Sequence, residues 1–177
     1  IGMDAWLACL AYGARRVLIL TGSETPQSIR DVLQRQIGYT APILEGMGYS
    51  GAAIEALDSG DVDTLTAAAT SDQAIGLQSP ARFAPPPEKR LLLRTAINYL
   101  LEHAPSHRKV AALAAGAPFG RVKVDAAACT RCMSCVAVCP TSSLREGQGL
   151  PQLNFVERSC IQCGSCEKAC PEDAVSL

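Results

Sequence analysis

The chain has 177 residues and a formal net charge of −1, with 48% hydrophobic but only 5% aromatic residues. Its length allows one domain of ordinary size or two small ones, and the near-neutral charge argues against a basic surface for nucleic acid or anionic lipid. No apolar run approaches the ~20 residues that a membrane-spanning helix needs. Because the chain begins at Ile1 and ends soon after its last cysteine, we expect it to be a fragment of a longer protein.

The first predicted element is a helix over residues 4–12, in which Trp6, Leu7 and Leu10 recur at helical spacing. Cys9 lies beside these residues and stands apart from the other cysteines. We expect it to be a small buried hydrophobic residue rather than a reactive group or a ligand.

A strand, a long helix and a second strand follow in the predicted order. The apolar run at 16–20 predicts a buried strand, and the segment 21–26 opens a helix that Pro42 is expected to kink or break. Residues 52–57 predict the next strand. The three elements predict one βαβ unit with a parallel strand pair, and hence an α/β domain with a small parallel sheet.

The turn between the first strand and the long helix, Thr21-Gly22-Ser23, has the position of an anion-binding turn. It lacks both the G-x-G-x-x-G pattern and a P-loop lysine, so nucleotide binding is not favoured there. Capping of the helix by Ser23 or Thr25 is the favoured interpretation.

Two more helices are predicted, one over 61–69 capped by Asp61 and one over 88–103. Glycine, proline and alanine then dominate a predicted linker. We therefore divide the chain into an α/β docking domain at 1–104, a linker at 105–120 and a cysteine-rich α+β domain at 121–177.

Eight of the nine cysteines form two copies of the pattern C-x2-C-x2-C-x3-C-P, offset by 31 residues. The first copy holds Cys129, Cys132, Cys135 and Cys139, and the second holds Cys160, Cys163, Cys166 and Cys170. Three closely spaced cysteines can wrap around one iron–sulfur cubane and give thiolates to three of its irons. Zinc is the alternative, but the third cysteine and the closing Cys-Pro of each copy favour the cluster.

Residues 121–177 resemble the bacterial dicluster ferredoxins through these two complete motifs. The resemblance implies two [4Fe–4S] clusters and crossed ligation, in which the cysteine before each proline serves the other loop's cluster. Cluster 1 would then be held by Cys129, Cys132, Cys135 and Cys170, and cluster 2 by Cys160, Cys163, Cys166 and Cys139. Met133 is a departure, because such ferredoxins usually carry glycine where the second copy has Gly164.

The N-terminal region, at 4–20 and 33–51, resembles the small δ-type iron–sulfur subunit of methyl-viologen-reducing hydrogenase and heterodisulfide reductase systems. In that family, cysteines of this region hold a [2Fe–2S] cluster. Only Cys9 is present here, so the resemblance implies a docking shape without the metal.

These observations predict an electron-transfer module rather than an enzyme, with no catalytic residues and a reducing, cytoplasmic location. Two oxidised clusters of about −2 each would bring the net charge to about −5, which favours a positively charged patch on the partner. The expected partner is a flavoprotein or another iron–sulfur subunit of a larger redox complex. Two alternatives remain: a fragment of a flavin-dependent oxidoreductase whose catalytic part lies elsewhere, and an interaction module whose clusters only brace the fold.

Overall fold

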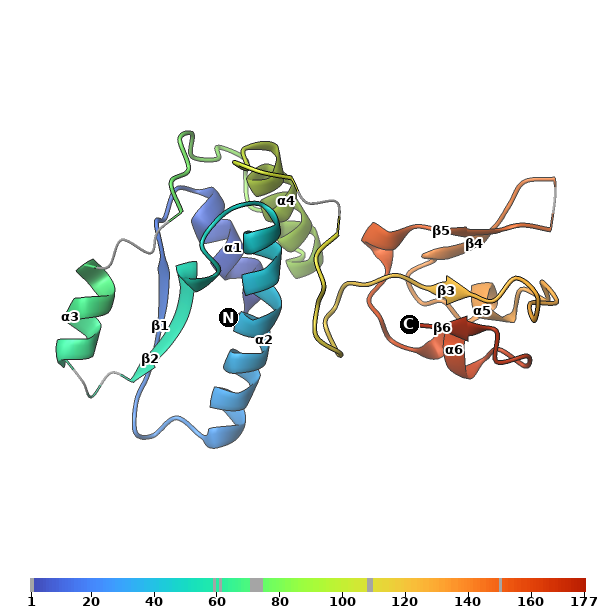
Figure 1. Ribbon diagram of the computed structural model, residues 1–177, viewed down its shortest axis with the longest axis horizontal. Coiled ribbons are helices and arrows are strands. Elements are labelled where there is room, and N and C mark those ends of the chain that lie inside the picture. The colour runs from blue at the N-terminus through green and yellow to red at the C-terminus, as the bar shows by residue number, and fades with distance from the viewer. Residues whose placement is uncertain (1, 59, 61, 71–74, 108–109, 150) are drawn as a thin grey trace. The chain divides into compact units, whose positions relative to one another are not determined.

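The computed structural model describes the whole chain except residues 1, 59, 61, 71–74, 108–109 and 150. The chain forms two compact units, 1–114 and 115–177 (Figure 1). The point of division falls within the segment that the sequence predicts as a linker. None of the described helices is both long and apolar enough to cross a membrane.

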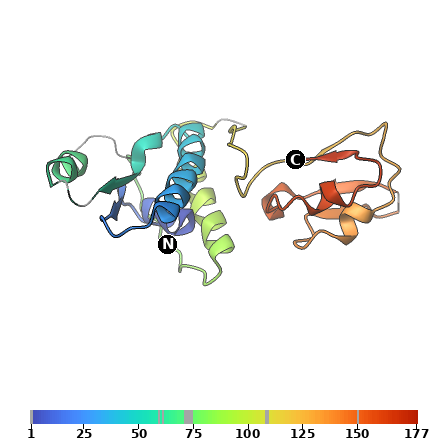
Figure 2. The same ribbon diagram turned by 90° about the horizontal axis from the view of Figure 1, so that it is seen from below.

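Two helices form the centre of the first unit. Helix α1 (Met3–Ala11) packs lengthwise against α4 (Lys89–Glu102), as Figures 1 and 2 show. The buried side chains include Trp6, Leu7 and Leu10 from α1 and Leu93, Ala96 and Leu100 from α4.

Cys9 is exposed, so the prediction that it is buried is wrong. Leu10 follows Trp6 by four residues and Leu7 by three, so the three side chains share the inner face of α1. Cys9 follows Leu7 by two residues, a spacing that turns it away from that face.

The parallel pair consists of β1 (Val17–Thr21) and β2 (Ile54–Asp58), in register from Val17 opposite Ile54 to Thr21 opposite Asp58. Helix α2 (Gln27–Gly46) connects the two strands, and α3 (Val62–Thr70) follows them. The second strand starts later than predicted, because Gly51–Ala53 form a 3₁₀ turn. The predicted cap Asp61 lies outside the described residues.

Helix α2 runs unbroken through Pro42, contrary to the expected break. A proline inside a helix removes one hydrogen bond and crowds the carbonyl four residues earlier, here that of Gly38. Glycine has the backbone freedom to adjust. Thr40 Oγ1 donates to the carbonyl of Ile37 at 2.8 Å, one residue before the acceptor that Pro42 leaves without its helical donor.

The second unit holds two small antiparallel sheets, each with one strand from either copy of the cysteine motif. Strand β3 (Lys123–Val124) pairs with β6 (Val175–Ser176), and β4 (Leu144–Glu146) pairs with β5 (Leu153–Phe155). Two short helices, α5 (Ser134–Ala137) and α6 (Ser165–Lys168), contact each other, and a 3₁₀ turn, η2 (Glu157–Ser159), precedes the second motif.

The structure of this unit repeats with the same 31-residue offset as its sequence. The amide of Asp125 donates to the carbonyl of Ala174, and the amide of Val156 donates to that of Ser143, each at 2.8 Å. The two donors, Asp125 and Val156, are 31 residues apart, and so are the two acceptors, Ser143 and Ala174. The strand that follows the cysteines of one copy, β4 or β6, is thus held beside the strand that precedes the cysteines of the other copy, β5 or β3. This pairing brings the last cysteine of each motif toward the other copy.

Candidate metal centre

Left-handed backbone turns shape both cysteine loops. Arg131 and Met133 have φ of 58° and 61°, and their counterparts Gln162 and Gly164 have φ of 55° and 76°. Most residues avoid this region, because the Cβ atom approaches the following carbonyl oxygen. Its use at equivalent positions indicates that the two loops follow the same backbone path.

The first loop surrounds a small cavity. Its lining includes the cysteines of that loop, Cys129, Cys132 and Cys135, together with Cys170 from the second copy. Leu153 and Val175 add apolar wall. Four thiol groups around one apolar cavity are the donor set that a [4Fe–4S] cluster requires, so these residues fit the cofactor.

In the second loop, the pKa of Cys163 is affected by a cysteine of the first copy. The hydroxyl of Ser165, 3.4 Å from Cys163 Sγ, is the main cause of a lowered pKa at Cys163, whereas negative charge on Cys139 acts to raise it. Burial raises the pKa of Cys166, with a smaller contribution from negative charge on Cys160 and Cys163. Cys139, from the first copy, is thus near enough to Cys163 for its negative charge to affect the pKa of that thiol.

The cysteines before the prolines receive matching backbone hydrogen bonds. The amide of Ser143 donates to Cys139 Sγ at 3.2 Å, and the amide of Ala174 donates to Cys170 Sγ at 3.3 Å. At Cys139, burial acts to raise the pKa, but several hydrogen bonds outweigh it and the pKa is lowered. The donors at Cys139 thus favour its thiolate, the form that binds metal.

Within each loop, the second and third cysteines have opposite environments. The hydroxyl of Ser134 lies 3.3 Å from Cys132 Sγ and is the main cause of the lowered pKa of that exposed thiol. Burial instead raises the pKa of Cys135. Cys163 and Cys166 show the same contrast, a lowered and a raised pKa, so the two copies repeat the pKa pattern as well as the backbone path.

A mainly apolar groove begins beside the first loop. Its lining includes Val124, Leu153 and Phe155, together with Cys129 and Arg131 of the first loop. An apolar surface next to a ligand cysteine offers a path for close approach to the site.

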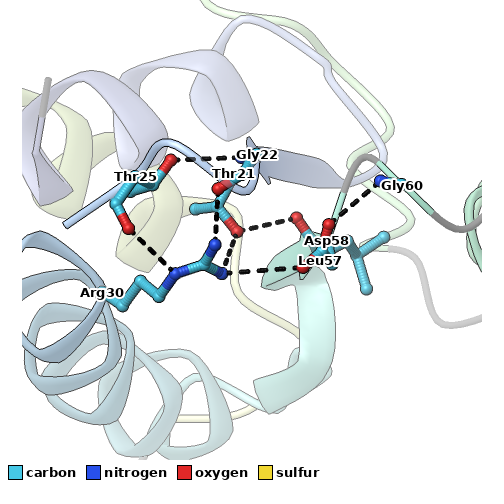
Figure 3. A network of polar contacts seen from close by, with 7 residues as sticks. All are labelled: Thr21, Gly22, Thr25, Arg30, Leu57, Asp58 and Gly60. Carbon is cyan, nitrogen blue, oxygen red and sulfur yellow. Dashed lines mark hydrogen bonds and ion pairs between the residues drawn. The ribbon is translucent and has the colours of Figure 1, made fainter. Parts of the chain in front are cut away.

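The turn after β1 is arranged differently from the anion-binding turn considered above. The guanidinium of Arg30 donates to Thr21 Oγ1 at 2.9 Å and to the carbonyl oxygens of Gly22 and Thr25 (Figure 3). Asp58 lies 3.8 Å from the same group. The turn thus directs oxygen atoms at a cation supplied by its own chain.

The expected helix cap at this turn is also wrong. Helix α2 has Pro26 at its N-cap position and no side-chain cap. Thr25 Oγ1 instead accepts from the amide of Gly22, which closes the turn before the helix begins.

The sequence prediction missed the residues that surround the sulfur atoms. Ser134 and Ser165 occupy equivalent positions, and Gln162 donates a hydrogen bond to Cys160 Sγ at 3.3 Å. The serines could have been found, because both follow a cysteine by two residues in the aligned copies. The glutamine gave no such signal, since Arg131 takes its place in the first copy.

Residues 128–175 match the family model of the 4Fe-4S dicluster domain, and all eight motif cysteines fall within the match. None of the curated proteins matches the chain. The family match does not extend into the first unit. The second unit therefore carries a 4Fe-4S dicluster domain, whose cofactors are two [4Fe–4S] clusters.

Proposed function

We propose that the chain is an electron-transfer module that passes single electrons through its two clusters to a redox partner. The observation that carries the proposal is the cavity lined by Cys129, Cys132, Cys135 and Cys170 within the dicluster domain. A bound [4Fe–4S] cluster supplies one-electron redox chemistry. No catalytic residue is assigned to this chain.

The ligands are assigned in the crossed arrangement. Cys129, Cys132, Cys135 and Cys170 hold cluster 1, and Cys160, Cys163, Cys166 and Cys139 hold cluster 2. Support comes from the pairing of β3 with β6, which carries Cys170 toward the first loop, and from the effect of Cys139 on the pKa of Cys163. Each cluster then links both copies of the motif.

The surrounding residues adjust the sulfur atoms for this task. Amide donors such as those of Ser143 and Ala174 compensate negative charge on the thiolates. That charge grows when an electron arrives, so such bonds stabilise the reduced state.

The partner is proposed to be a flavoprotein or another iron–sulfur subunit. Six basic residues balance six acidic residues in 115–177, so two clusters of about −2 each would make the loaded unit negative. A basic partner surface would then speed association, and the groove beside Cys129 offers apolar contact near cluster 1. Eight thiols committed to clusters suit a reducing compartment, for which we propose the cytoplasm.

The first unit is proposed to be the docking domain of the same system. Its strand–helix–strand order supports the resemblance to the δ-type subunit. Its single cysteine, Cys9, argues against a [2Fe–2S] cluster in that unit. The unit would then position the clusters rather than carry electrons.

The test is anaerobic purification followed by metal analysis and a redox titration. We expect about eight irons per chain, from four in each cluster, and reversible uptake of one electron by each cluster. Stoichiometric zinc in protein that has been reconstituted with iron and sulfide would contradict the proposal. Clusters that cannot be reduced reversibly would instead support a purely structural role.

A further inference from the structure

The two cysteine loops share a backbone path but differ in one side-chain donor. The amide nitrogen Nε2 of Gln162 donates to Cys160 Sγ at 3.3 Å, and the backbone amide of the same residue lies 3.5 Å from that sulfur. Arg131 holds the equivalent position in the first loop, 31 residues earlier. Among the described residues, Arg131 makes no hydrogen bond to a cysteine sulfur.

The position of Gln162 is fixed by its surroundings. Its side chain is half-buried and lies over Gly120, where an added Cβ atom would come within 2.7 Å of both Cδ and Oε1 of the glutamine. Cys160, the acceptor, is 8% exposed. The absence of a side chain at Gly120 therefore leaves the space that the amide occupies, and limited water at the acceptor strengthens the bond.

We infer that Gln162 is a potential-setting residue, whose hydrogen bond to Cys160 biases a shared electron toward cluster 2. A donor at a ligand sulfur stabilises the more negative reduced state more than the oxidised state, which raises the reduction potential. The bond is made by a neutral amide, so the bias adds no charge to the surface. Cluster 1 lacks this hydrogen bond, because Arg131 is an exposed residue that lines the cavity of the first loop without donating to a sulfur among the described residues.

This inference rests on the proposal that the second loop holds one cluster, and it extends that proposal to the distribution of electrons. It does not depend on the crossed ligands, since Cys160 belongs to the second loop in either assignment. A role as hydrogen-bond donor can be separated from a space-filling role. A side chain of similar length that cannot donate would preserve the second and remove the first.

The experiment compares the full-length loaded protein with its Gln162→Met variant. Methionine keeps the length of the side chain but cannot donate. In half-reduced protein, the hyperfine-shifted NMR signals of the cysteine β-protons report how the electron is shared between the clusters. We expect the share to move about tenfold toward cluster 1, which corresponds to about 59 mV for a one-electron couple.

A second variant, Gly120→Ala, touches no cysteine but displaces the amide, so it should shift the electron in the same direction. Gln152→Met is the control, because Gln152 lies in the same unit and donates to Asn154 rather than to a sulfur. An unchanged electron share in both test variants, with both clusters intact, would overturn the inference. A wild-type protein with no cluster at the second loop would instead overturn the proposed function.

Discussion

The two units of this chain are stabilised in different ways. In the first, Trp6, Leu7, Leu10, Leu44 and Leu100 are at most 3% exposed and come from α1, α2 and α4, of which α1 contacts the other two. In the second, the buried apolar side chains are few, and Cys160 and Cys166 are among them. The comparison shows one unit built on hydrophobic burial between helices and another whose small core includes two of the motif cysteines.

Removal of iron is expected to give the largest difference between the units. An anaerobic chelator should unfold 115–177, because metal binding supplies much of the folding free energy of such a small unit. The first unit should remain folded. Residue-resolved hydrogen exchange checks this, and amide protection that persists in 115–177 after complete iron loss would contradict it.

Loss of one bridging thiolate is expected to damage one cluster. Cys139→Ala should convert cluster 2 to a three-iron form or eliminate it, and spare cluster 1. Cys170→Ala is the mirror variant and should damage cluster 1. Iron analysis and EPR spectra, compared with variants of Cys132 and Cys163, identify the affected cluster.

The outcome that would contradict crossed ligation is specific. If Cys139→Ala removed the cluster of the first loop and left that of the second loop intact, each motif would hold its own cluster. The strand pairing would then have to be explained by packing alone.

A core substitution in the first unit is expected to leave the clusters unaffected. Leu10→Ala should lower the free energy of unfolding of that unit by about 2–5 kcal/mol, since Leu10 is fully buried between helices. Cys9→Ala, one residue away on the exposed face, is the control and should change it by less than about 0.5 kcal/mol. Denaturant unfolding followed by tryptophan fluorescence measures both, because Trp6 is the sole tryptophan.

The smallest expected effect concerns Met133 and Gly164, equivalent left-handed positions at which one loop carries a side chain and the other a glycine. Met133 has a left-handed φ of 61°, which costs about 1–2 kcal/mol for a residue with a side chain. Glycine avoids that cost but loses more entropy on folding. Met133→Gly should therefore stabilise the loaded unit by up to about 1 kcal/mol.

The matched variant, Gly164→Ala, should destabilise the unit by a similar amount. The added Cβ would meet only Leu177 Cδ1 at 3.8 Å, an ordinary contact, so the cost would be conformational. Thermal loss of the cluster absorbance compares the two variants. Equal effects of the same sign would show that packing, and not backbone strain, governs this position.

Much of the first unit could be predicted from periodicity, although its details could not. Helical spacing located α1 and α4, and apolar runs located the two strands. The continuous path of α2 through Pro42 was not predicted, because a proline inside a helical pattern by itself favours a kink or a break. The exposure of Cys9 could have been derived from the helical period, had its two-residue offset from Leu7 been considered.

For the site, the sequence alone determined the chemistry. The type and spacing of the cysteines identify a dicluster domain, because only a few loop geometries give three thiolates to one cubane. The tertiary structure decided which residues surround the sulfur atoms. The pairing of β3 with β6 brings Cys170 to the first loop, and the open space at Gly120 brings the amide of Gln162 to Cys160. Such contacts join residues distant in the chain, and their formation depends on packing that no local pattern encodes.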